Sequence, residues 1–136
     1  MFLTDKTNEI LQALKGSEML SDTIVIASFP FAYKPTRLQK CLLTVSPHGM
    51  KAEQEGIGES RLFGALQIRL TAFVPQDMGS PVAADVLDRA AAVLAPLHPR
   101  DIEMGEIKVR DDLEAFSKTG VFTFTDHMNS GGNNGG

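Results

Sequence analysis

The sequence predicts an α+β fold, in which two helices pack on a mostly antiparallel β-sheet in the order α-β-β-β-α-β-β. The first observation is the alternation of apolar and polar residues from Arg61 to Val74. A period of two is typical of a strand with one buried face, and this strand exceeds the usual ~5–6 residues. The second observation is that apolar residues recur at helical spacing in two segments, Asp5–Lys15 and Pro81–Ala95.

The chain is expected to form one domain over residues 1–128. A chain of 136 residues can bury a single core without disulfides or metals, and its composition of 43% hydrophobic and 22% charged residues is ordinary for a globular protein. Residues 129–136, NSGGNNGG, contain no apolar side chain. We therefore expect them to form a disordered Gly/Asn-rich tail.

The first helix, Asp5–Lys15, is expected to end at Gly16, a residue suited to the position after a helix. Its apolar stripe is narrow, which predicts a helix lying on a sheet surface, and consists of Leu3, Ile10, Leu11 and Leu14. The β-branched segment Ile24–Phe29 predicts the first strand. Pro30 and Pro35 cannot donate to a central ladder, so FPFAYKP is predicted to be an extended connector.

The next two strands predict a long antiparallel hairpin. The first of them is Lys40–Ser46, and the second is the long strand Arg61–Val74. The segment between them, Pro47–Ser60, holds three glycines and mixed charge, which predicts an extended, mobile tip. One face of the first strand is expected to be buried through Cys41, Leu43 and Val45.

The second helix has Ser80 as a predicted N-cap and Pro81 at its first position, and Pro96 ends it. Its apolar stripe comprises Val82, Val86, Ala90, Val93 and Leu97. We expect three residues of the long strand, Leu66, Ile68 and Leu70, to face this stripe across the core.

Two further strands are predicted in the last third of the chain. Met104–Arg110 is expected to turn Ile107 and Val109 inward, and Thr119–Asp126 alternates phenylalanine with threonine. Asp111–Phe116 between them predicts a loop or one helical turn.

Charge and cysteine content exclude several classes of function. The formal net charge of -4 and pI near 5.3 give no basic footprint for reading nucleic acid. The single cysteine, Cys41, lies in the apolar run KCLLTV, so we expect a buried thiol and a reducing compartment. The first residues, MFLTDKTNEI, lack the pattern of a signal peptide, and no apolar run approaches the ~20 residues of a membrane span.

No pattern in the sequence predicts catalysis, a cofactor or a metal. The histidines His48, His98 and His127 lack metal-ligand spacing. The glycines of GIG at 56–58 are followed by Arg61 and a strand, where a dinucleotide fingerprint needs glycine and a helix. The carboxylate pairs Glu53/Glu55 and Asp111/Asp112 are expected to be solvated charge clusters. The chain is therefore predicted not to be an enzyme.

Assembly is the function that the long hairpin favours. The polar face of the long strand and the charged tip supply the predicted subunit interface, which comprises Glu53, Glu55, Arg61, Gln67, Arg69 and Thr71. Arg61 and Arg69 share the polar face, and each is expected to reach an acidic residue of the next subunit, such as Glu53 or Asp88. Such contacts between unlike surfaces build rings.

The layout resembles that of the tail terminator, or tail completion, proteins of long-tailed bacteriophages and phage-tail-like particles. The residues that carry the resemblance lie between 3 and 126: FPFAYKP, LLTVSPHGM, the strand LQIRLTAFVP, the helix GSPVAADVLDRAAAVL and the closing EIKVRDDLEAFSKTGVFTFT. The resemblance implies a non-enzymatic ring, usually a hexamer, that caps the tail tube, ends its growth and provides the surface that joins tail to head.

The resemblance also implies the partners and the place of action. The implied partners are further copies of the chain, the tail tube protein and the head-tail connector, with the tail sheath as a further candidate. The implied place is a virion tail that is assembled in the bacterial cytoplasm. Two alternatives stay open. One is another phage part, such as a connector, tube or baseplate component. The other is a small-molecule-binding or enzymatic α+β domain, which needs a pocket with convergent polar groups.

Overall fold

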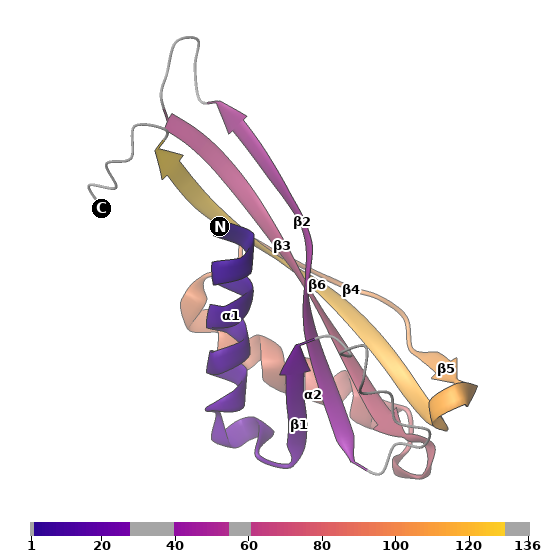
Figure 1. Ribbon diagram of the computed structural model, residues 1–136. Coiled ribbons are helices and arrows are strands. Elements are labelled where there is room, and N and C mark those ends of the chain that lie inside the picture. Colours follow the sequence, from indigo (N-terminus) through magenta and orange to yellow (C-terminus); the bar gives the residue numbers. More distant parts are fainter. Residues whose placement is uncertain (1, 28–39, 55–60, 130–136) are drawn as a thin grey trace.

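The fold is a six-stranded sheet with two helices, seen in the computed structural model, which describes residues 2–27, 40–54 and 61–129. The elements, labelled in Figure 1, are α1 (Phe2–Lys15), β1 (Thr23–Ala27), β2 (Cys41–Gln54), β3 (Arg61–Pro75), α2 (Pro81–Leu94), β4 (Asp101–Met104), β5 (Lys108–Arg110) and β6 (Ala115–Asn129). Short 3₁₀ turns join several of them: η1 (Glu18–Leu20), η2 (Gln76–Met78), η3 (Ala95–Leu97) and η4 (Asp111–Leu113). This confirms the predicted α+β class.

The sheet is mostly antiparallel. Its strand order is β1-β2-β3-β6-β4, and β5 pairs with β6 on the same side as β4. Among the strands that the structure describes, only β1 and β2 run parallel, with Thr23 opposite Cys41 and Ala27 opposite Val45. The antiparallel pairs β2–β3 and β3–β6 are the longest in the sheet.

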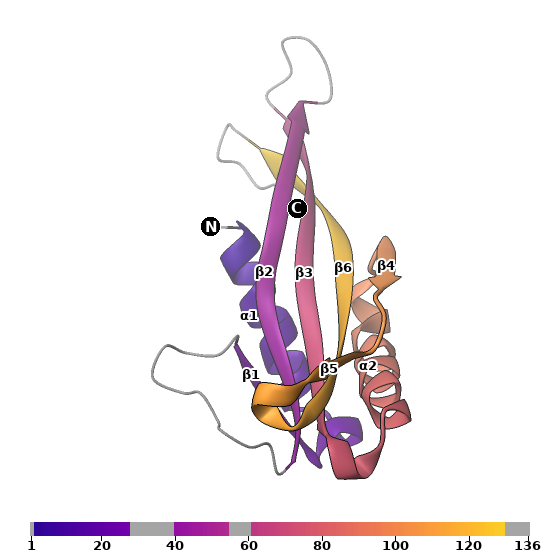
Figure 2. The same cartoon turned by 90° about the vertical axis from the view of Figure 1, so that its right-hand side faces the viewer.

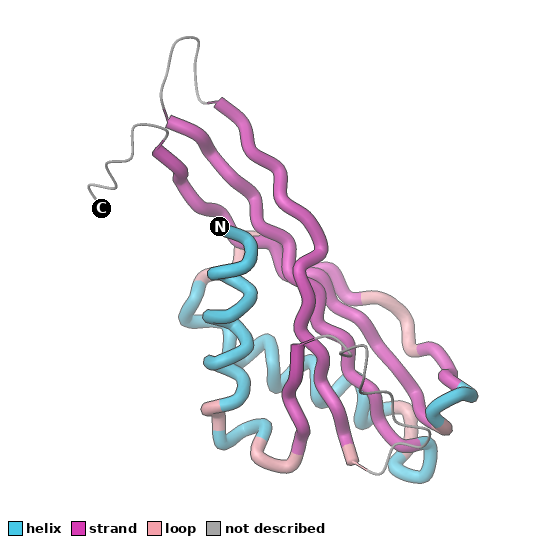
Figure 3. Tube along the Cα trace, viewed as in Figure 1, coloured by secondary structure: helices cyan, strands magenta, loops and turns pink. Residues whose placement is uncertain are grey.

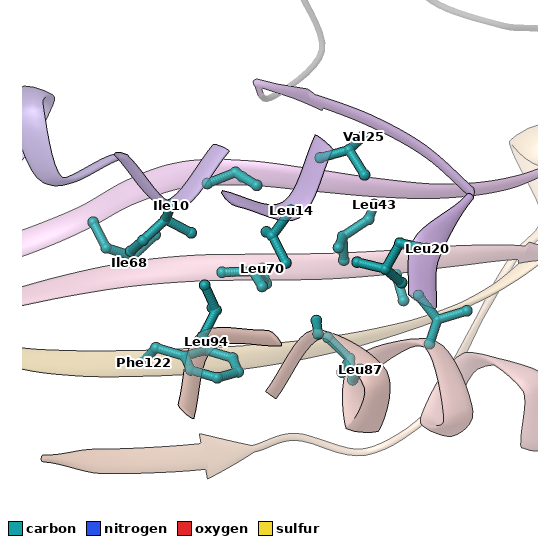
Figure 4. Packing of buried hydrophobic residues seen from close by; sticks show 14 of the residues in the cluster. Ile10, Leu14, Leu20, Val25, Leu43, Ile68, Leu70, Leu87, Leu94 and Phe122 are labelled. Carbon is teal, nitrogen blue, oxygen red and sulfur yellow. The ribbon is translucent and has the colours of Figure 1, made fainter. Parts of the chain in front are cut away.

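Both helices cover one face of the sheet (Figure 2), and the main core lies between them and that face. Alternate residues of β3 enter this core, and Ile68, Leu70 and Ala72 are fully buried. They belong to the same cluster as the helix residues Ile10, Leu14, Val86, Leu87, Ala90 and Leu94. Figure 4 shows Ile10, Leu14, Leu87 and Leu94 among these side chains. The predicted inward faces of β3, α1 and α2 are confirmed except at Leu3, whose side chain the structure does not describe. Val82, Val93 and Leu97 pack on the cluster while partly buried.

A second, smaller apolar cluster lies on the opposite face of the sheet. It consists of Leu42, Phe73, Leu113 and Ala115, with Ile26 packed against it. Leu42 and Phe73 alternate with core residues, so they point away from the helices. The turn η4 covers them and lies in front of β2 and β3 in Figure 2. The sequence pattern did not predict this cluster.

Three strands continue beyond the helices as an arm, which comprises Lys51–Gln54 of β2, Arg61–Ala65 of β3 and Thr125–Asn129 of β6 (Figures 1 and 3). β1 pairs with β2 only as far as Val45, and β4 pairs with β6 only from Gly120 to Thr123. Over residues 2–27, 40–54 and 61–129, no strand pairs with the outer side of β2 or of β6 within the arm.

The hairpin differs from its prediction in where the strands end. β2 does not stop at Ser46 but continues to Gln54, so most of the expected tip is strand, and 55–60 lies outside the described residues. A β-bulge between Pro47 and Gly49 absorbs His48. Pro47 lies past Val45, the last residue of β2 that pairs with the described part of β1, so its missing N–H breaks no ladder bond to that part of β1.

The C-terminal strands also differ from their prediction. The expected strand Met104–Arg110 is two short strands, β4 and β5, which makes six strands in place of five. Ile107 and Val109 are not turned inward: they are 39% and 57% exposed. β6 begins at Ala115 rather than at Thr119, after the predicted helical turn at 111–113.

The remaining boundaries agree closely with the sequence. α1 begins at Phe2 and ends at Lys15, and α2 covers Pro81–Leu94. The first strand is Thr23–Ala27, one residue earlier than predicted, and its expected end at 28–29 lies outside the described residues, as does the connector. Asn129, the expected first residue of the tail, is instead the last residue of β6, where it pairs with Arg61, and residues 130–136 lie outside the described residues. Ser80 does not cap α2 with its side chain.

Candidate assembly surfaces

The polar face of β3 presents one exposed charge among partly covered polar side chains. Arg69 is exposed, whereas Gln67 and Thr71 are half-buried. The Thr71 hydroxyl lies 3.0 Å from that of Thr119, and the Thr44 hydroxyl donates to the Thr71 carbonyl at 3.5 Å. Thr71 is therefore engaged within the sheet, and Arg69 is the residue of this face best placed to meet a partner.

The other predicted interface residues lie farther along the arm or outside the described residues. Glu53 pairs with Phe63 in the β2–β3 ladder, and Arg61 pairs with Asn129 in the β3–β6 ladder. Glu55 falls outside the described residues. Since strands rise ~3.4 Å per residue, Arg61 and Arg69 stand roughly 27 Å apart, so each needs its own acidic partner. Asp88 is exposed on α2, on the helical side of the sheet.

Exposed large apolar side chains gather at both edges of the sheet. We define the β1-edge patch as Ile24 and Met78, which are 40% and 49% exposed. We define the β5-edge patch as Ile107 and Val109. β1 and β4–β5 are the two edges of the sheet, and they lie on opposite sides of the helix-bearing half in Figure 1. Sequence reasoning missed both patches, because alternation alone does not tell which face is covered.

A cavity of about 270 Å³ opens beside β1. Its lining comprises Ser21–Ile24, Lys40, Cys41 and Met78. The Cys41 thiol faces Met78, with the two sulfur atoms 3.6 Å apart. Burial raises the pKa of Cys41, and the negative charge of Asp22 adds to that rise. The predicted burial of Cys41 is confirmed, since the residue is 5% exposed.

We expect the Cys41 thiol to resist modification in the folded protein. Thiolates are the reactive species, and both the burial and the raised pKa of this thiol keep it protonated near neutral pH. Titration with a chromogenic disulfide reagent checks this: labelling is expected to be slow in buffer and complete in denaturant. A Cys41→Ala, Val109→Cys variant, with its single thiol at the exposed edge, provides the fast-reacting control. Equal rates for the two thiols in buffer would contradict the assignment.

An ion cluster fastens α2 to the entrance of this cavity. Nη1 of Arg89 donates to the Met19 carbonyl at 2.8 Å and to the Asp22 carboxylate at 3.2 Å. Nε lies 3.1 Å from the Asp85 carboxylate, an ion pair without hydrogen-bond alignment. Burial pushes the pKa of Asp22 upward, but hydrogen bonds from Arg89 and Thr23 and the Arg89 charge together lower it. The cluster of one arginine and two carboxylates carries one excess negative charge.

The remaining polar candidates stand apart from one another. His48 lies exposed in the bulge, and His98 is exposed with a left-handed backbone at φ 57°. The Asp112 carboxylate accepts from Arg110 at 3.0 and 3.1 Å. Among the residues that the structure describes, no three His, Cys, Asp or Glu side chains gather as metal ligands. Within those residues, no helix has the length and apolar character to cross a bilayer.

No protein-family model matches the sequence, and no curated protein matches it. The surfaces of the fold are therefore the basis for any functional conclusion: the arm, the exposed Arg69 and the two edge patches.

Proposed function

We propose that the protein is a structural subunit of a phage tail, which assembles into a ring that caps the tail tube, ends its growth and joins the head. Its partners are further copies of itself in a ring, usually a hexamer, the tube protein and the head-tail connector, with the sheath as a further candidate. The observation that carries the proposal is the three-stranded arm, in which no strand of the described residues pairs with the outer side of β2 or of β6. The resemblance of the sequence layout to tail terminators supplies the biological setting.

The two edges suit association between unlike surfaces. Across the arm, Lys51 is level with Ala65 and Thr125, and Gln54 is level with Leu62 and Met128. The outer edges of β2 and β6 therefore stand at the same height. Unpaired edges present backbone N–H and C=O groups that readily accept another strand. When one side of a subunit meets the other side of the next, the contact repeats, and it closes into a ring where the rotation allows.

Shortening the arm tests the proposal. The variant replaces Lys51–Ala65 with an Asn-Gly turn, which closes the hairpin on the existing pair Met50–Leu66. We expect the helix-bearing body to stay folded and the ring to be lost, as measured by particle mass in solution and by tail length in electron micrographs. A chain truncated after Asn129 serves as the control and is expected to assemble normally. An unaltered ring in the shortened variant would contradict the role of the arm.

We expect Arg69→Glu to weaken the ring more than any histidine substitution. Arg69 is exposed on the polar face of β3, and interfaces depend on a few arginine or apolar anchors. A loss of about tenfold in the association constant corresponds to ~1.4 kcal/mol. His48→Ala and His98→Ala are the comparison variants, measured by sedimentation at several protein concentrations. Equal effects of the three substitutions would overturn this ranking.

A further inference from the structure

One edge patch borders a hollow, and the other presents exposed apolar side chains. The β1-edge patch flanks a hollow, the cavity of about 270 Å³ lined by Ile24, Cys41 and Met78. In the β5-edge patch, Val109 stands exposed within a strand of three residues, and Ile107 stands exposed directly before that strand. A water molecule occupies ~30 Å³ of liquid, so the cavity has the volume of about nine waters. That volume accommodates a branched aliphatic side chain.

The charges around the patches are complementary. Glu106 and Lys108 alternate with the apolar residues of the β5-edge patch and are exposed. Beside the cavity lie Lys40, which is exposed, and the Asp22–Arg89–Asp85 cluster with its excess negative charge. Each edge therefore carries one positive and one negative site: Lys108 and Glu106 on the β5 edge, and Lys40 and the anionic cluster on the β1 edge. Such complementarity fixes the register of two surfaces and excludes mismatched pairings.

We propose that the cavity beside β1 receives the β5-edge patch of a second copy of this chain. Val109 of one copy enters the cavity between Ile24 and Met78 of the next, Lys108 meets the Asp22–Arg89–Asp85 cluster, and Glu106 meets Lys40. The contact joins opposite edges of the sheet, so it is head to tail and uses each patch once per subunit. The inference rests on the ring of the proposed function and adds a contact between the subunit bodies, separate from the arm.

Crosslinking of mixed variants tests the contact directly. In a Cys41→Ala background, one variant carries Ile24→Cys and a second carries Val109→Cys, and a short bis-maleimide is added to each alone and to their mixture. We expect covalent dimers in the mixture only. A mixture of Glu9→Cys, exposed on α1, with Val109→Cys gives the background from random collisions. A chain that carries both edge cysteines is expected to give a ladder that ends at the copy number of the ring.

Two results would overturn the proposal. Dimers formed by Val109→Cys alone or by Ile24→Cys alone, in the same yield as in the mixture, indicate a two-fold contact between like edges. A mixture that gives no more dimer than the Glu9→Cys background shows that the edges do not meet. Neither result removes the proposed function, because the shortened-arm variant and the tail-length measurement test it separately.

A substitution in the native background provides a second measurement. Val109→Asp is expected to leave thermal unfolding unchanged, because the side chain is exposed, and to lower the association constant at least tenfold. Val109→Ile keeps an apolar side chain at the same position and is expected to preserve association. Equal association of the two variants would contradict the insertion of Val109 into the cavity.

Discussion

We expect Ile68→Ala to lower the free energy of unfolding by about 2–5 kcal/mol, the usual range for truncating a fully buried aliphatic side chain. Ile68 is 0% exposed at the centre of β3, within the cluster that both helices share. The cavity left behind cannot collapse easily, because strands pair with β3 on both sides. For a chain of this size, the melting temperature should fall by roughly 8–20 °C.

The neighbouring residue on the same strand gives a matched control. Arg69→Ala changes a larger side chain, but it is exposed on the opposite face, so its effect on unfolding should stay within about 0.5 kcal/mol. Chemical denaturation of both variants measures the difference. If Ile68→Ala melted with the parent protein, the inward face of β3 would be wrongly assigned.

We expect Leu113→Ala to lower the free energy of unfolding by about 2–3 kcal/mol, near the lower end of the range for buried leucine. Leu113 is 2% exposed and holds η4 against Leu42 and Phe73 on the face away from the helices. Arg110 supports the same turn, with its guanidinium 5.4 Å from the Phe73 ring centroid and paired with Asp112. Loss of Leu113 therefore loosens the cover of the second cluster without touching the main core.

Val109→Ala, a few residues earlier, is the control for this second substitution. Val109 is 57% exposed, and truncating it should change the free energy of unfolding by less than about 0.5 kcal/mol. Equal effects of Leu113→Ala and Val109→Ala in urea unfolding would show that the second cluster contributes nothing to stability.

Patterns within single segments of the sequence correctly predicted the buried faces of both helices and of β3, and the start of α2. The helical spacing of Ile10, Leu14, Val86 and Ala90 and the alternation of Leu66, Ile68 and Leu70 correctly indicated which faces are buried. Pro81 marked the start of α2, because its fixed backbone suits the first turn of a helix. These signals lie within single elements and need no knowledge of what packs opposite.

The prediction was wrong where the length of a strand or the burial of its side chains depends on a neighbouring element. Pro47 looked like the end of a strand, yet β2 continues because β3 pairs with it as far as Gln54, while the described part of β1 pairs only as far as Val45. Ile107 and Val109 alternate with charged residues like a half-buried strand, but neither α1 nor α2 covers β5, so they stay exposed. β6 reaches Asn129 although Asp126 and His127 give no apolar signal, because β3 supplies a partner along that whole length. Of the predicted interface residues, sequence placed Arg69 on an exposed face correctly, and it missed both edge patches.

The pairing of the arm determines its polarity. β2 and β6 are both antiparallel to β3, so the two outer edges of the arm run in the same direction. Copies that join by these edges therefore pair as parallel strands, and every arm of such a ring points the same way along its axis. The ring then has two dissimilar rims, one formed by arms and the other by helix-bearing bodies. A directional filament that binds one rim of such a ring leaves the other rim, with its different surface, at the free end. A terminating cap requires this difference between its two rims.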